Sequence, residues 1–141
     1  MSQPSESGHA LIGSWKLLAV KFEFAEGGEP LALFGGAPRG RLIVTGTGDF
    51  MTIITSEDRA LLHDSARLFD TMMGYAGKFR LEGDKITISC DLSWHPAWVG
   101  TEQVRFVELH GDKLRLRSPE QTHPRYPDRL GRGVIDWTRE G

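Results

Sequence analysis

The sequence lacks most of the features that assign a chain to a specialised class of protein. Cys90 is its only cysteine, which excludes an internal disulfide framework and favours a reducing compartment. It has no apolar run of about 18 residues, so no transmembrane helix is predicted. The formal net charge is only −2, and this balance gives no reason to expect nucleic acid or an anionic membrane as a partner.

The N-terminal stretch Met1–Ala10 is polar and has no hydrophobic segment, so no secretory signal is predicted. We interpret it as a disordered lead (residues 1–10) before one domain over residues 11–141. Together with the single cysteine, this pattern predicts a cytoplasmic protein.

Metal, phosphate and nucleophile motifs are also missing. The histidines show no metal-ligand spacing, and no cysteine joins them: His9, His63, His95, His110 and His123. The glycine-rich stretch Phe34–Gly40 lacks the Gly-Lys-Ser/Thr ending of a phosphate loop, and no Gly-x-Ser-x-Gly elbow occurs. The sequence therefore predicts no metal and no cofactor, and it identifies no reaction.

What the sequence does contain is alternation of apolar and polar residues, cut by turns that contain glycine. This pattern indicates antiparallel β-structure. We predict eight strands: Ser14–Phe24, Arg41–Thr45, Phe50–Thr55, Tyr75–Leu81, Lys85–Trp94, Thr101–Leu109, Lys113–Ser118 and Gly133–Arg139.

One segment between the third and fourth strands, Glu57–Met73, has helical spacing of its apolar residues. Ser56 is the expected N-cap, and Gly74 is the expected stop.

The lengths of the connections predict how the strands are arranged. In an up-and-down meander, alternate connections lie at opposite ends, and here the long ones alternate with the tight ones. All long connections therefore fall at one end and all tight turns at the other. This is the arrangement of an all-β, eight-stranded antiparallel up-and-down β-barrel with an open mouth and a closed floor.

Two hairpin turns set the facing of side chains. Two-residue loops at Gly83-Asp84 and Gly111-Asp112 place Leu81 opposite Ile86 and Leu109 opposite Leu114. By alternation, Gln103 and Arg105 then project into the barrel near its mouth. There they would form a polar handle for a carbonyl, enolate or carboxylate oxygen. The alternatives are that Arg105 pairs with an internal acid such as Asp136, or that it faces solvent.

Aromatic and sulfur side chains gather at the same end. Trp94 and Trp98 either grip a flat apolar ligand or plug the barrel. Met72 and Phe79 are further candidates for the pocket lining. His95 is a candidate general base or a simple turn residue, and Tyr75 a candidate proton donor or a core residue.

Three stretches carry a family resemblance. Gly13 and Trp15 open the first strand and Arg139 ends the last, which resembles the Gly-x-Trp and terminal arginine of lipocalins and other calycins. The stretches Leu11–Leu17, Tyr75–Phe79 and Trp98–Phe106 are similar to the lipocalin-like domain family. The resemblance covers about Leu11–Glu140. It implies a barrel that binds small, mostly apolar molecules, with the arginine packed across the tryptophan at the closed end.

Three hypotheses follow for function. The first is binding of a small apolar or amphipathic molecule, with Gln103 and Arg105 holding an oxygen. The second is a cofactor-independent isomerase or cyclase in the same cavity, in which Arg105 stabilises an oxyanion and His95 or Tyr75 moves a proton. The third is a filled barrel that acts only through its surface. The sequence assigns no oligomeric state.

Overall fold

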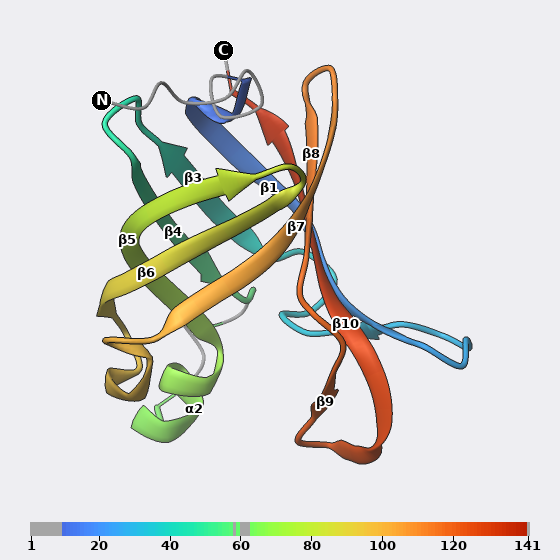
Figure 1. The fold of residues 1–141 in the computed structure, drawn as a ribbon. Coiled ribbons are helices and arrows are strands. Elements are labelled where there is room, and N and C mark those ends of the chain that lie inside the picture. The colour runs from blue at the N-terminus through green and yellow to red at the C-terminus, as the bar shows by residue number, and fades with distance from the viewer. Residues whose placement is uncertain (1–9, 58, 60–62, 141) are drawn as a thin grey trace.

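Eight main strands follow one another around a closed barrel in the computed structural model, which describes residues 10–57, 59 and 63–140 (Figure 1). The final strand pairs back with the first and closes the sheet. In order around the barrel the strands are β1 (Gly13–Phe24), β3 (Arg39–Val44), β4 (Asp49–Thr55), β5 (Met72–Glu82), β6 (Lys85–Ser93), β7 (Glu102–His110), β8 (Lys113–Arg117) and β10 (Tyr126–Arg139).

Two short strands extend the sheet beside the barrel. β2 (Leu31–Ala32) pairs with the far end of β1, and β9 (Gln121–His123) pairs with the first half of β10. The predicted eight-stranded antiparallel barrel is thus confirmed, although β10 begins at Tyr126 rather than at Gly133. The expected disordered lead, apart from Ala10, lies outside the described residues.

The two predicted hairpins have the expected register. Leu81 pairs with Ile86 and Leu109 with Leu114. The tight turns and the long connections therefore lie at opposite ends. Figure 1 shows the helix α2 (Ser65–Asp70), the loop between β6 and β7, and β9 at the lower end, and the start of β1 and the end of β10 at the upper end.

The closed end is built around Trp15, which is completely buried. The Arg139 guanidinium lies 4.2 Å from the centroid of the Trp15 ring, within the range of a cation–π contact. Arg139 also donates hydrogen bonds to the carbonyl oxygens of Ile12, at 2.9 Å, and Ala10. These bonds tie the segment that precedes β1 to the last strand.

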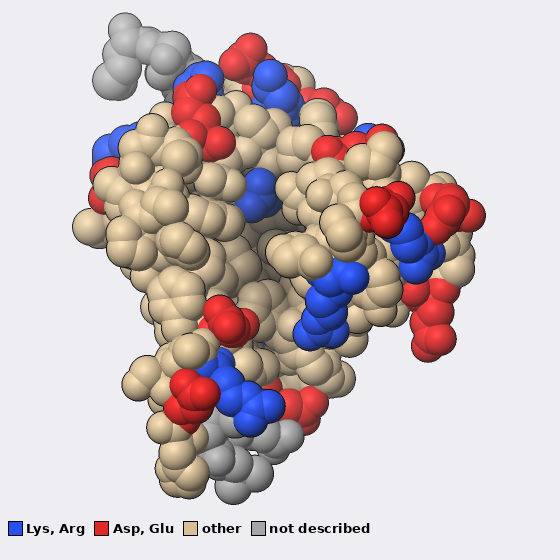
Figure 2. Space-filling model, turned by 90° about the horizontal axis from the view of Figure 1, so that it is seen from below, with Lys and Arg blue, Asp and Glu red and all other residues tan. Residues whose placement is uncertain are grey.

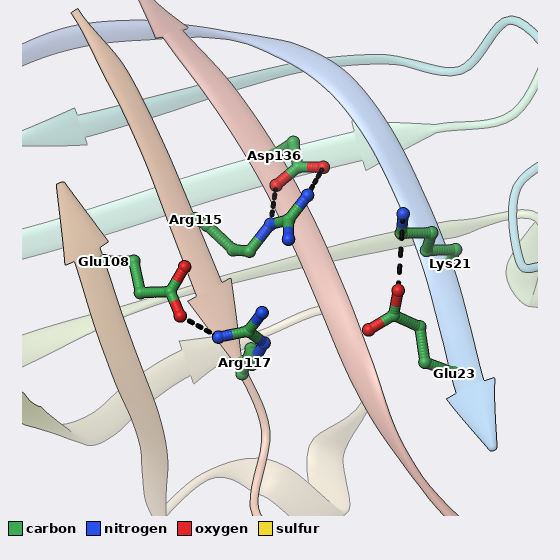
Figure 3. A network of polar contacts seen from close by, with 6 residues as sticks. All are labelled: Lys21, Glu23, Glu108, Arg115, Arg117 and Asp136. Carbon is green, nitrogen blue, oxygen red and sulfur yellow. Dashed lines mark hydrogen bonds and ion pairs between the residues drawn. The ribbon is translucent and has the colours of Figure 1, made fainter. Parts of the chain in front are cut away.

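The outer face of β1, β7, β8 and β10 carries a network of ion pairs (Figure 3). Arg115 holds both carboxylate oxygens of Asp136, at 2.6 and 3.1 Å, and Arg117 pairs with Glu108. Since Asp136 lies on the outer face and is already paired, it does not balance a charge inside the barrel.

The predicted helix is wrong in its extent. Residues 58 and 60–62 lie outside the described residues, and α2 covers only Ser65–Asp70, with the Asp64 carboxylate accepting the Ala66 N–H. Met72 and Met73 belong to β5, where they pair with Thr55 and Ile54. The expected stop, Gly74, is also inside this strand. Sheet pairing here outweighs the helical spacing of the apolar residues.

The structure also corrects the predicted orientation of a side chain at the end of β6. Alternation places Leu92 inside, but its side chain is 65% exposed. A bulge is the cause: Gly77 pairs with Cys90 while Ala76 pairs with Leu92, so Asp91 is the extra residue. This bulge turns Leu92 outward at the last step before the mouth.

Candidate functional site

A cavity of about 380 Å³ opens at the end of the barrel that carries α2 and β9. Figure 2 looks onto this end and shows a hollow whose surroundings are largely uncharged. One wall comes from α2, the start of β5 and the β6–β7 loop: Phe69, Met72, Met73, Trp94, His95 and Trp98. The other comes from β1, β10 and the segment after β2: Val20, Leu33, Phe34 and Ile135.

Aromatic rings form a continuous chain along the first wall. Phe69 lies 6.0 Å from Trp94, and Trp94 lies 5.0 Å from Trp98 in an edge-to-face arrangement. Trp98 in turn approaches Tyr75 at 5.3 Å. Ring separations of this size are typical of favourable aromatic pairs. The predicted mouth aromatics therefore pack into a wall and leave a cavity beside them.

Arg105 is brought to the cavity by the pairing of β6 with β7. Arg105 lies opposite Ile86, and Gln103 lies opposite Ile88. Both isoleucines are buried, so both polar residues share the inward face. Only Arg105 lines the cavity. The Gln103 amide instead donates to the Thr101 hydroxyl at 2.8 Å.

The positive charge of Arg105 has no acidic partner among the described residues. Its guanidinium donates to the backbone carbonyl of Val104 at 2.7 Å, and the ion pairs of the described residues do not include it. Both alternatives from the sequence, pairing with Asp136 and a solvent-facing position, disagree with this geometry. A half-buried guanidinium with one carbonyl contact keeps several N–H donors free.

Tyr75 and Phe79 do not line the cavity. The Tyr75 side chain is 5% exposed and stacks on Phe50, with ring centroids 5.8 Å apart. Burial raises the pKa of the Tyr75 phenol, and the nearby Arg105 guanidinium opposes this rise. Phe79 packs against the buried core. Tyr75 contacts the cavity wall through Trp98, whereas Phe79 packs against the core.

His95 lines the cavity, but one of its ring nitrogens is already engaged. It caps the short 3₁₀ turn η2 (Pro96–Trp98), because its Nδ1 accepts the N–H of Ala97 at 3.2 Å. The neutral ring therefore carries its proton on Nε2. In this tautomer His95 has no free ring lone pair with which to act as a general base.

Trp94 combines an apolar ring with an unsatisfied polar atom. Its backbone N–H donates to the Gly74 carbonyl at 2.8 Å. Its indole Nε1 is buried, and no acceptor within the described part of the chain meets it. A buried N–H without an acceptor is unfavourable, and the indole Nε1 of Trp137 is in the same state.

Sequence reasoning placed Trp94, Trp98, Met72, His95 and Arg105 at the site, and all of these line the cavity. It missed the wall that β1, β10 and the segment after β2 supply. Leu33 and Phe34 lie in a glycine- and proline-rich connection, where apolar residues show no periodicity. Two large apolar side chains in such a loop are the signal that could have identified them.

Within the described residues, no cluster of three or more His, Cys, Asp or Glu side chains could hold a metal ion. The described helices include none long and apolar enough to cross a membrane. Cys90 is buried, and burial raises the pKa of its thiol, which makes it a core residue rather than a nucleophile.

Comparison with known protein families agrees with this geometry. The model of the lipocalin-like domain matches residues 12–139, which is most of the chain. A search of curated proteins finds no match.

Proposed function

The chain belongs to the lipocalin-like domain family, and on this premise we propose that it binds a small apolar or amphipathic molecule in the mouth cavity. Barrels of this family are associated with binding small hydrophobic ligands in general. In the finer proposal the apolar body of the ligand lies against Trp94, Trp98 and Met72, and Arg105 holds an oxygen atom. Gln103, Tyr75 and Phe79 support this site from outside the wall.

The observation that carries the proposal is the position of Arg105. A guanidinium that faces a mostly apolar cavity and has no carboxylate within ion-pair distance among the described residues is costly for the protein alone. A ligand oxygen that accepts hydrogen bonds from it reduces that cost and orients the ligand. The cavity volume, about 380 Å³, is within the range of small-molecule sites.

A second candidate is an isomerase or cyclase without a cofactor. The closeness of Arg105 to the Tyr75 phenol favours it, because the pair could stabilise an oxyanion and move a proton. His95 fits this role less well than expected, since its Nδ1 is engaged. Incubation of co-purified metabolites with wild type and Arg105→Ala separates the two candidates. Product formation by wild type alone favours the enzyme, and binding without product favours the binding protein.

We further propose a reducing, cytoplasmic location, supported by the single buried cysteine. Cell fractionation with an antibody against the chain tests this.

Two fluorescent probes test the binding proposal. N-phenyl-1-naphthylamine is neutral, and 8-anilinonaphthalene-1-sulfonate has a similar apolar body and a negative charge. We expect wild type to bind both probes. Arg105→Met keeps an apolar side chain of similar length, so it should weaken the anionic probe by roughly tenfold and leave the neutral probe within about twofold.

Arg80→Met is the matched control, because Arg80 is an exposed arginine paired with Glu102 on the outer face. It should change neither affinity. Absence of binding of both probes to folded wild type would contradict the proposal.

A further inference from the structure

We propose that the protein forms a symmetric dimer, in which the outer face of β3, β4, β5 and β6 packs against the same face of a second copy. This inference concerns the outside of the barrel and is independent of the proposed function. The four strands are neighbours in the sheet and lie side by side on the left of the barrel in Figure 1. The outward positions at the centre of this β3–β6 face are apolar or small: Ile43, Met51, Ile53, Gly74, Ala76 and Leu92.

Apolar residues form one continuous row across the β3–β6 face. Ile43 of β3 pairs with Met51 of β4. Met51 also pairs with Ala76 of β5, and Ala76 pairs with Leu92 of β6. The three large side chains of this row are each at least 38% exposed. Single exposed apolar residues are ordinary on a protein surface, whereas a contiguous group of them marks an interaction surface.

The β3–β6 face has a ridge and a furrow side by side. Along β4, Met51 and Ile53 are about half exposed and form the ridge. Their cross-strand partners on β5 are Ala76 and Gly74, which have only a methyl group or no side chain, so β5 forms the furrow. A surface of this shape is complementary to a rotated copy of itself, which is the requirement for an isologous dimer.

One position of the two-fold axis places each ridge over the furrow of the other copy. The axis runs parallel to the strands, midway between β4 and β5. Rotation about it exchanges β4 with β5 and keeps the position along the strands, so each residue meets the partner's copy of its own cross-strand neighbour. Met51 then meets Ala76 of the partner subunit, and Ile53 meets Gly74 of the partner subunit.

The charges beside the apolar row agree with this axis. Asp49 of β4 pairs with Lys78 of β5, and the ammonium nitrogen lies 2.6 Å from the carboxylate. The rotation places Asp49 against Lys78 of the partner subunit, so two ion pairs become one group of four alternating charges. An axis along β4 would instead place Asp49 against its own copy, and an axis along β5 would do the same for Lys78. Both of these alternatives bring like charges together, which is unfavourable in an interface.

The size of the β3–β6 face predicts a weak, reversible dimer. Four strands about 4.8 Å apart make a face roughly 20 Å wide. The contact is therefore at the small end of specific interfaces, below about 800 Å² per subunit. We expect a dissociation constant on the order of 10–100 µM.

Sedimentation velocity of the full chain over about 5 to 500 µM measures this association. We expect the weight-average mass of wild type to rise with concentration from that of a monomer towards twice that value. Met51→Glu places a carboxylate on the ridge, where the partner subunit offers only an apolar contact. It should raise the dissociation constant at least about tenfold.

Leu130→Glu is the matched control for Met51→Glu. The Leu130 side chain is equally exposed but lies on β10, outside the β3–β6 face. It should leave the dissociation constant unchanged. Since both positions are exposed, both variants should have the thermal midpoint of wild type at low concentration, where all three proteins are monomeric.

Two charge variants test the position of the axis. Asp49→Lys gives the face two positive charges and Lys78→Asp gives it two negative charges, so each variant alone should associate at least about tenfold more weakly than wild type. Mixed in equal amounts, the two variants should form a heterodimer, because every pair that meets across the axis again has opposite signs. Mixing cannot repair a defect within one chain. Recovery of association therefore shows that position 49 meets position 78 of the other copy.

Three results would overturn the proposal. Wild type that stays monomeric at about 500 µM has no second copy on this face; binding to phosphatidylcholine vesicles that is lost in Met51→Glu would then assign the face to a membrane surface. A dimer that Met51→Glu leaves intact uses another surface. Folded charge variants that fail to associate on mixing contradict the axis between β4 and β5.

Discussion

The Arg105 guanidinium influences the ionisation of the buried Tyr75 phenol. Burial favours the neutral phenol of Tyr75 and raises its pKa, whereas the positive charge of Arg105 favours the phenolate. The Tyr75 side chain is 5% exposed, so its ionisation in the folded protein exposes little of the new charge to water.

This arrangement predicts the alkaline limit of stability. Because the pKa of Tyr75 is raised above the unfolded value of 10.0, its contribution to stability is complete below about pH 10 and is lost as the pH rises through the higher folded-state pKa. Tyr75→Phe removes this ionisation. Its urea midpoint should fall less steeply than that of wild type between about pH 9 and pH 11.

Tyr126→Phe is the control for that experiment, since the Tyr126 side chain is 38% exposed. Its urea midpoint should fall with rising pH as steeply as that of wild type. If the urea midpoints of wild type and Tyr75→Phe fall equally steeply, another group causes the loss of stability at alkaline pH.

At the residue scale, the sequence predicts which side of the sheet a side chain faces better than it predicts which residues that side chain contacts. The register of two hairpins was enough to turn Arg105 inward, because side chains in a strand alternate strictly. It did not reveal that Asp136 pairs with Arg115 or that Trp94 Nε1 lacks an acceptor. Such contacts depend on which strands meet around the barrel and on how loops pack, and neither follows from local periodicity.

Among the elements, the β5–β6 pair shows why alternation fails at the mouth. The bulge at Asp91 accompanies a very close approach of two backbones: a Cβ on Gly77 would lie 2.0 Å from the Ser89 carbonyl oxygen. Only glycine fits this position. The bulge thereby sets the direction in which the chain continues to Trp94.

Two glycine substitutions in β5 test this reading. Gly77→Ala should lower the free energy of unfolding by about 2 kcal/mol or more, because the backbones must separate to accept the methyl group. Gly74→Ala is the matched control: its Cβ would meet neighbouring atoms at 3.4 Å and beyond, which is ordinary contact. It should change stability by less than about 0.5 kcal/mol. Equal costs in urea denaturation would contradict the close approach.

In the α2 region, the local spacing of apolar residues predicted a helix that extends beyond the observed one. The spacing of apolar residues over Glu57–Met73 is helical, yet Met72 and Met73 join β5. Pairing with Thr55 and Ile54 satisfies their backbone groups in the sheet, so long-range pairing overrides the local pattern. The eight strands themselves were predictable, because each has its own alternation and turn.

At the scale of the whole molecule, the two ends of the barrel differ: one is closed by packed side chains, and the other holds the cavity. Trp15 and Trp137 are buried among the strands towards the closed end, where Arg139 covers Trp15. Trp94 and Trp98 line the open cavity. The connection lengths predicted this polarity from the sequence, because a meander sorts its links by end. The chemistry of the cavity came only from the assembled walls.

The four tryptophans allow a direct measurement of where a ligand binds. In a ¹H–¹⁵N spectrum of labelled protein each indole Nε1–H gives its own signal, which Trp→Phe variants assign. On titration with N-phenyl-1-naphthylamine, the signals of Trp94 and Trp98 should shift, while those of Trp15 and Trp137 should stay in place. A saturable titration that moves Trp15 and Trp137 and leaves Trp94 and Trp98 unchanged would contradict binding in the mouth cavity.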